Sequence, residues 1–114
     1  MRIKKKHIEG ILMTIHTYNV NTGTPIAGLL WENISLGTKR RLQKISKELH
    51  VHLEELKTNL SELEGLEDDK KASELEILLS EEVEISSEPI MMSQIESIQT
   101  DKNYDFEMIE LIAV

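Results

Sequence analysis

The chain has 114 residues, which is enough for one small domain. Hydrophobic residues make up 39% of it and aromatic residues only 4%, so a core would be built from Leu, Ile, Val and Met, which favours packed helices over a β-sandwich. Because there is no Cys, the composition excludes disulfides, thiolate zinc sites and thiol nucleophiles.

The net charge of −8 is divided unevenly along the chain. Residues 1–50 carry nine Lys or Arg against three Glu, a net of +6, whereas residues 51–114 carry four Lys against eighteen acids, a net of −14. This asymmetry predicts either an electrostatic partner or pairing between the two halves. No run approaches the roughly 18 apolar residues of a membrane span, so we expect a soluble intracellular protein without a membrane partner.

Residues 1–35 are expected to form a short N-terminal helix or strand followed by a loop. Apolar residues recur at helical spacing over residues 7–18, although Gly10 weakens a helix there by about 1 kcal/mol relative to Ala. Asn, Gly and Pro within residues 19–25 predict a turn or loop. The short apolar stretch that follows ends at Trp31, the only Trp, which we expect to fill the core.

The strongest pattern is a long amphipathic helix over residues 36–64. Ser35 is a candidate N-cap because its hydroxyl can accept a hydrogen bond from a backbone N–H of the first turn, and Gly65 is a helix stop. Leucines recur every seven residues, with a second row offset by four that is interrupted at Ser46. The resulting leucine seam consists of Leu42, Leu49, Leu53, Leu56, Leu60 and Leu63.

Two interpretations of the leucine seam stay open. It can be an interface between copies of the chain, or it can be the inner face of a long helix in a monomeric bundle. The small size of the chain favours self-association, because a second copy would help to bury enough surface. We therefore expect a homo-oligomer with the seam as its interface.

A charged connection leads into residues 73–112, which are expected to form acidic C-terminal helices. The pattern predicts helices over residues 73–80 and 104–113, a short extended stretch before Pro89, and a helix of one or two turns capped by Ser93. The fold class is thus predicted as mostly α. One small domain would be built on the long amphipathic helix, with the short helices packed on it.

A basic cluster crowds the start of the long helix. Its members are Lys39, Arg40, Arg41 and Lys44. Each positive charge there opposes the helix dipole by about 0.3–1 kcal/mol, so an anion should offset them. That anion can be an external phosphate group, or the acidic half of the protein, for example the run from Glu81 to Glu84. We favour pairing with polypeptide, because surface charge runs are usually solvated or paired and seldom bind a ligand. Nucleic acid in particular is disfavoured, since interleaved aromatic residues are missing and the overall charge is negative.

Metal binding and catalysis have little support. His50 and His52 would point about 200° apart on a helix and cannot share a metal, and no third ligand accompanies a pair of His52 with Glu48 or Glu55. Residues 21–28 lack the Lys and the spacing of a phosphate-binding loop. We therefore expect a non-enzymatic protein with no catalytic residue, no metal site and no cofactor, and we expect His52 to flank the leucine seam, half-buried.

The C-terminal half has a recognisable order of features. "ELEILLSEEVEISSEPIMMSQIES" (74–97) follows a long Lys- and Glu-rich helix and a charged linker, and "YDFEMIELI" (104–112) follows it. Over residues 36–112 this order resembles a set of small helical proteins of tailed phages. The resemblance implies a phage accessory or virion-assembly protein in the host cytoplasm or the virion, acting through contacts with itself or with another phage or host protein. The alternative is an anion-binding protein that uses the basic cluster, either an anti-defence protein that sequesters a nucleotide signal or a nucleic-acid binder.

Overall fold

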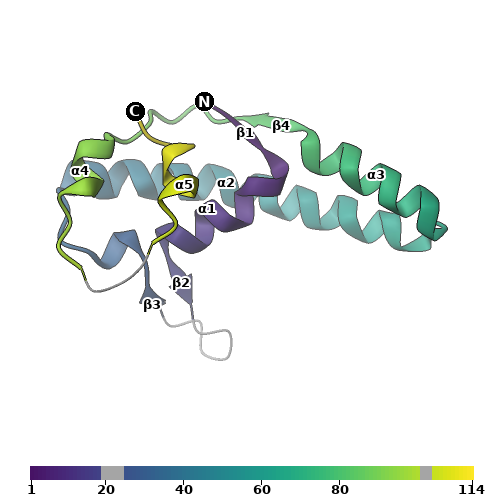
Figure 1. Ribbon diagram of the computed structural model, residues 1–114, viewed down its shortest axis with the longest axis horizontal. Coiled ribbons are helices and arrows are strands. Elements are labelled where there is room, and N and C mark those ends of the chain that lie inside the picture. Colours follow the sequence, from purple (N-terminus) through teal and green to yellow (C-terminus); the bar gives the residue numbers. More distant parts are fainter. Residues whose placement is uncertain (19–24, 101–103) are drawn as a thin grey trace.

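The computed structural model describes residues 1–18, 25–100 and 104–114, and it confirms a mostly helical chain (Figure 1). The long helix is α2, Leu36–Glu62, and a 3-10 turn, η3, continues it over Leu63–Gly65. Along its principal axes the molecule measures 48 × 33 × 21 Å. The predicted turn at residues 19–25 lies, apart from Pro25, outside the described residues.

Helix α2 begins and ends close to where its sequence predicts. The Ser35 hydroxyl accepts a hydrogen bond of 3.2 Å from the backbone N–H of Thr38, which confirms the predicted N-cap. Gly65 closes the 3-10 turn at the other end. A single uninterrupted helix therefore runs from the main body of the molecule to its far tip (Figure 1).

The most deeply buried helix is α1, Ile8–Ile15, which follows the 3-10 turn η1, Lys5–His7. Helix α1 contacts both α2 and the last helix, α5, Phe106–Glu110. A Cβ atom on Gly10 would lie 3.1 Å from the Met108 sulfur, so the missing side chain allows α5 to approach. We expected the short helices to pack directly on the long helix. Helix α5 packs on α1 instead, because α1 has apolar residues on several of its sides.

Two small antiparallel sheets and one bridge join distant parts of the chain. Strand β1, Arg2–Lys4, pairs with β4, Glu82–Glu84, with Ile3 opposite Val83. Strand β2, Thr17–Tyr18, pairs with β3, Pro25–Ala27, and Ile90 forms a parallel bridge with Ala113. The extended stretch before Pro89 was predicted, but its pairing with the N-terminus was not, because pairing depends on the tertiary arrangement.

The C-terminal helices differ in their bounds from the predicted ones. Helix α3, Asp68–Ser80, begins five residues early, because Asp68 and Asp69 in its first turn suit the positive end of the helix dipole. Helix α4, Met92–Glu96, has no side-chain cap, so the cap predicted at Ser93 is wrong. Helix α5 is shorter than residues 104–113, and the Asp105 carboxylate caps it by accepting from two backbone N–H groups.

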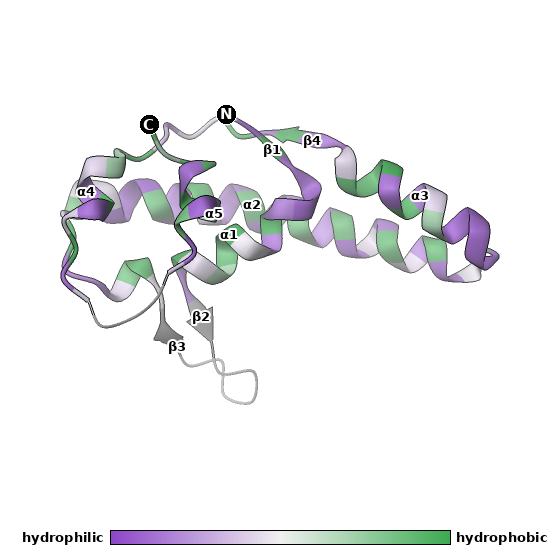
Figure 2. Cartoon of the chain, viewed as in Figure 1, coloured by the Kyte–Doolittle hydropathy of each residue, from purple (hydrophilic) through white to green (hydrophobic). Residues whose placement is uncertain are grey.

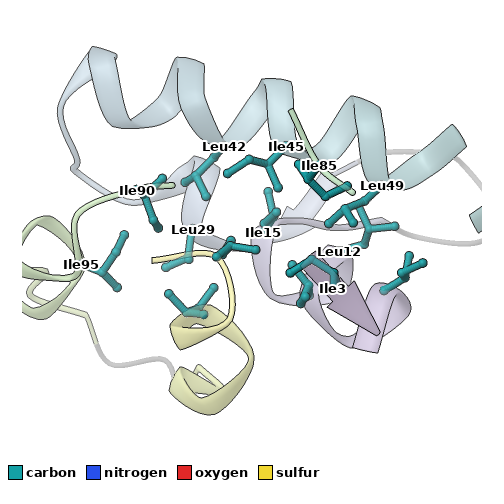
Figure 3. Close-up of a cluster of buried hydrophobic side chains, with 14 of the residues drawn as sticks. Ile3, Leu12, Ile15, Leu29, Leu42, Ile45, Leu49, Ile85, Ile90 and Ile95 are labelled. Carbon is teal, nitrogen blue, oxygen red and sulfur yellow. The ribbon is translucent and has the colours of Figure 1, made fainter. Parts of the chain in front are cut away.

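The leucine seam faces the inside of a single chain. Leu42 and Leu49 are 0% exposed and Leu56 is 5% exposed, while Leu53, Leu60 and Leu63 are half-buried. Figure 3 shows Leu42, Ile45 and Leu49 of α2 directed into the same cluster as side chains of α1 and of the C-terminal segment. Burial of each such side chain stabilises the fold by about 1.5–3 kcal/mol. Leu42, Leu49 and Leu56 are therefore buried within a single chain and are not free to contact another copy, whereas an interface between copies stays a prediction for the half-buried Leu53, Leu60 and Leu63.

Beyond the core, α2 and α3 form a projecting hairpin. Helix α3 runs back beside the C-terminal half of α2, and its start at the tip of the hairpin is strongly hydrophilic (Figures 1 and 2). Ile77 on α3 and Val51 on α2 are about 60% exposed. Within residues 1–18, 25–100 and 104–114, no helix combines the length and apolar character needed to cross a bilayer.

Candidate functional site

An open hollow of about 810 Å³ lies beside Trp31, where the end of α1, the 3-10 turn η2 (Leu29–Trp31) and the first half of α2 meet. We call this hollow the Trp31 groove. It is lined by His16, Leu30, Trp31, Lys39, Gln43, Ser46, Lys47 and His50. The hollow is an open depression on the surface and not an enclosed pocket. Of the described residues that line it, none is acidic.

Trp31 is exposed to solvent on the turn η2. The indole is 58% exposed, although we expected it to fill the core; Leu29, two residues earlier, is 0% exposed and takes that place. The Trp31 backbone N–H donates to the Gly28 carbonyl at 3.0 Å, and Gly28 has a φ of 134°, a conformation that favours glycine. A Cβ on Gly28 would lie 2.4 Å from the His16 Cα atom, so this glycine also allows the turn to approach α1.

The residue after Trp31 ties this turn to the C-terminal segment. The Glu32 carboxylate accepts a hydrogen bond of 3.0 Å from the Thr100 hydroxyl and another from the Tyr104 hydroxyl. Trp31 therefore lies between two anchors, the buried Leu29 side chain and the Glu32 carboxylate. The backbone that carries the exposed indole is anchored in this way, so the turn itself would lose less freedom on binding than a mobile loop would.

The polar wall of the groove is one face of α2. Lys39, Gln43 and Lys47 are spaced four residues apart, and Ser46 and His50 form a parallel row with the same spacing beside them, which places these side chains on a common helix face. Two ammonium groups thereby come to the same hollow as the indole. The groove has the three components, an aromatic face, cations and hydrogen-bonding groups, that suit an anionic ligand with a planar part.

Two histidines form the floor of the groove. His16 Nε2 and the Ser46 hydroxyl share a buried hydrogen bond of 2.9 Å. The imidazole rings of His16 and His50 stack with their centroids 5.7 Å apart. Burial lowers the pKa of His16, the neighbouring His50 lowers it further, and a backbone hydrogen bond opposes the shift. At neutral pH the His16 ring is therefore uncharged, and it connects α1 to α2 through a neutral contact.

The structure separates the predicted basic cluster. Lys39 lines the Trp31 groove, whereas Arg41 and Lys44 line another hollow with Ser86, Ser87 and Glu88. The Arg41 guanidinium lies 3.5 Å from the Glu88 carboxylate, so one member of the cluster does pair with the acidic half. Arg40 is exposed and lines neither hollow. The four cations do not converge on one anion, because successive residues of a helix point in different directions.

The acidic run from Glu81 to Glu84 has other partners than the one we expected. Glu81 lies 3.2 Å from the Lys5 ammonium, and Glu84 lies 3.4 Å from the Arg2 guanidinium. Both contacts follow from the antiparallel register of β1 and β4, which places the basic start of the chain beside this run. Among the described residues, the two halves of the protein thus pair mainly through the N-terminal segment, and Arg41 is the member of the basic cluster that contributes an ion pair.

Sequence reasoning missed Lys47, His50, Gln43 and Trp31 as members of one site. The polar stripe on α2 was readable from its spacing, but its alignment with Trp31 depends on how η2 folds back over α1. His52, which we expected as a half-buried flank of the leucine seam, is half-buried, and its Nδ1 lies 3.8 Å from the Glu55 carboxylate. In the described part of the chain, no three metal-binding side chains of His, Asp or Glu gather at one point.

Comparisons with family models, with curated proteins and with solved structures each found no match.

Proposed function

We propose that this protein is a non-enzymatic binding protein whose ligand is an anion held in the Trp31 groove. The observation that carries the proposal is the presence of Lys39 and Lys47 beside the exposed Trp31, in a hollow without acidic lining residues. The proposal replaces the predicted cluster at residues 39–44 by a set that shares only Lys39 with it.

The charge distribution supports this proposal. The chain carries −8 overall, so a general attraction of anions to the whole surface is not expected. Anion binding would depend on a local positive region, and the groove supplies one at a distance from the acidic hairpin of α2 and α3. In view of the resemblance to small phage proteins, we further propose an accessory role in a tailed phage, in the host cytoplasm or in the virion.

Titration with inorganic tripolyphosphate at low ionic strength tests the proposal. Trp31 is the only Trp of the chain, so its fluorescence reports on the groove directly. We expect saturable quenching that weakens with added salt and is lost in a Lys39→Ala, Lys47→Ala double variant. A matched Arg40→Ala, Arg41→Ala double variant should bind as the wild type does. Equal loss in both double variants, or no response of the wild type, would contradict the proposal.

A second candidate function is a contact protein that associates with itself through the projecting hairpin. The exposed Ile77 and Val51 side chains, one on each helix of the hairpin, motivate it, because association with a second copy would remove both from water. The opposite net charges of the two halves of the chain make a second copy the best matched partner. Sedimentation of the wild type should then show a concentration-dependent oligomer, and Ile77→Asp should make it monomeric. A monomeric wild type at all concentrations rules this candidate out.

A further inference from the structure

We infer that the ligand of the Trp31 groove is a nucleotide unit, with its base stacked on Trp31 and its phosphates held by Lys39 and Lys47. The inference rests on the proposed anion-binding function and names the chemical class of the anion. The shared chemistry is a heteroaromatic base joined to phosphate, whether it comes from a free nucleotide or from a single-stranded nucleic acid.

The position of Trp31 supports a stacked base. An indole that is 58% exposed contributes little to the core, so its burial does not explain its place in the fold. The turn that carries it is fixed on both sides, by Leu29 in the core and by Glu32 through Thr100 and Tyr104. Exposed aromatic faces are the platforms on which proteins stack nucleic-acid bases, and the stacking tolerates any base because every base has a π-face.

The two lysines support a phosphate group next to that base. Lys39 and Lys47 are eight residues apart on α2, which separates their Cα atoms by about 12 Å along the helix axis. Their long, flexible side chains can converge on one phosphate or on successive phosphates of a chain. Gln43 lies between them on the same helix face and offers both a donor and an acceptor. An inorganic anion would interact with the two lysines alone, because it has no planar group that could stack on the indole.

The structure also supplies what the basic cluster lacked in the sequence. No aromatic residue lies among residues 39–44, which speaks against nucleotide binding by that segment. The fold corrects this by placing Trp31 beside Lys39 and by adding Lys47 from two turns further along the helix. Cations and a stacking surface are therefore present together, although they are separate in the sequence.

The test compares four probes on the full chain by calorimetry and by Trp31 fluorescence. They are ATP, adenosine, inorganic tripolyphosphate and a single-stranded oligoadenylate. We expect ATP or the oligoadenylate to bind more tightly than either adenosine or tripolyphosphate, because only the former two join a base to phosphate. Tighter binding of ATP identifies a free nucleotide as the source, and tighter binding of the oligoadenylate identifies a single strand; both outcomes support the inference.

Variants separate stacking from charge. Trp31→Ala, followed by calorimetry, should weaken the binding of ATP about 5- to 150-fold, which corresponds to the loss of one stacked base. It should leave the affinity for tripolyphosphate unchanged. Trp31→Phe should restore part of the affinity, which a merely structural role for the indole would not explain. Lys47→Ala should weaken both ATP and tripolyphosphate, whereas Lys44→Ala, a matched change in the other hollow, should weaken neither.

Failure of the inference and failure of the proposed function give different results. If tripolyphosphate binds as tightly as ATP and Trp31→Ala changes neither affinity, the nucleotide inference is wrong and anion binding stands. If none of the four probes binds, both are wrong. Circular dichroism and thermal unfolding of each variant show whether it is folded, and Trp31→Phe serves if Trp31→Ala does not fold.

Discussion

The imidazole rings of His16 and His50 stack at the floor of the Trp31 groove, with centroids 5.7 Å apart and 22° between their planes. His16 is buried and shares a hydrogen bond with Ser46, whereas His50 is exposed. A proton on His16 would place a charge in a poorly solvated position, next to a second imidazole and in a groove that also contains Lys39 and Lys47. We therefore expect the stability of the fold to depend on the protonation of His16.

The free energy of unfolding is expected to fall as the pH drops from 7.5 to 5.5. Because the pKa of His16 is lowered in the folded state, the unfolded chain binds a proton there first. Stability is therefore full above the unfolded pKa of about 6.5 and decreases below it, until the folded pKa is reached. Urea unfolding across this range measures the slope. His16→Gln should give a shallower slope, and an unchanged slope would contradict the assignment.

Leu49→Ala should destabilise the protein by about 2–5 kcal/mol, because it opens a cavity in the core beneath α2. Leu36→Ala, at a position 70% exposed near the start of the same helix, is the matched control and should change stability by less than about 0.5 kcal/mol. Chemical denaturation measures both. If Leu49→Ala instead dissociated an oligomer and left the chain folded, the internal position of the leucine seam would be wrong.

Two glycines should respond in opposite directions to replacement by alanine. Gly28→Ala is expected to destabilise the fold by several kcal/mol, since its φ is 134° and a Cβ would lie 2.4 Å from the Ile15 carbonyl oxygen. Gly37→Ala lies in the first turn of α2 with open space around it and should stabilise by up to about 1 kcal/mol. Thermal unfolding of the two variants gives the comparison. A neutral Gly28→Ala would show that η2 is not held closely against α1.

Glu48→Ala should lower stability by about 1–2 kcal/mol at pH 7, because the Glu48 carboxylate accepts hydrogen bonds from the backbone and hydroxyl groups of both Ser86 and Ser87. Partial burial raises the pKa of Glu48, but these hydrogen bonds outweigh that effect and hold it below the usual value. Its contribution is therefore present above about pH 4.5 and lost as the pH falls through the folded pKa.

A surface ion pair provides the control for that change. Glu54 lies 3.5 Å from Lys57 on an exposed face of α2, so Glu54→Ala should change stability by less than about 1 kcal/mol. Denaturation of both variants at pH 7 and pH 4 makes the comparison. If Glu48→Ala and Glu54→Ala lower the free energy of unfolding equally at pH 7, the hydrogen bonds of Glu48 do not hold the Ser86–Ser87 segment against α2.

Local patterns predicted the elements that depend on neighbouring residues. The leucine spacing defined α2 almost to its ends, and the Ser35 cap has the expected hydrogen bond, because both depend on groups within a few residues of one another. The pairing of Arg2–Lys4 with the acidic strand was not predictable in this way. A strand of three residues has no pattern of its own, and its partner lies about eighty residues away.

Helical period and composition are local properties, so the order of residues alone predicts a mostly helical chain with one long amphipathic helix and an uneven distribution of charge. The packing of the whole chain was needed to place Leu42 and Leu49 of that helix against α1, and Trp31 at the surface with Lys39 and Lys47. These positions follow from competition for the core. The isoleucines of α1, together with Leu29, fill the space that Trp31 was expected to occupy, and the indole is left at the surface beside the polar face of α2.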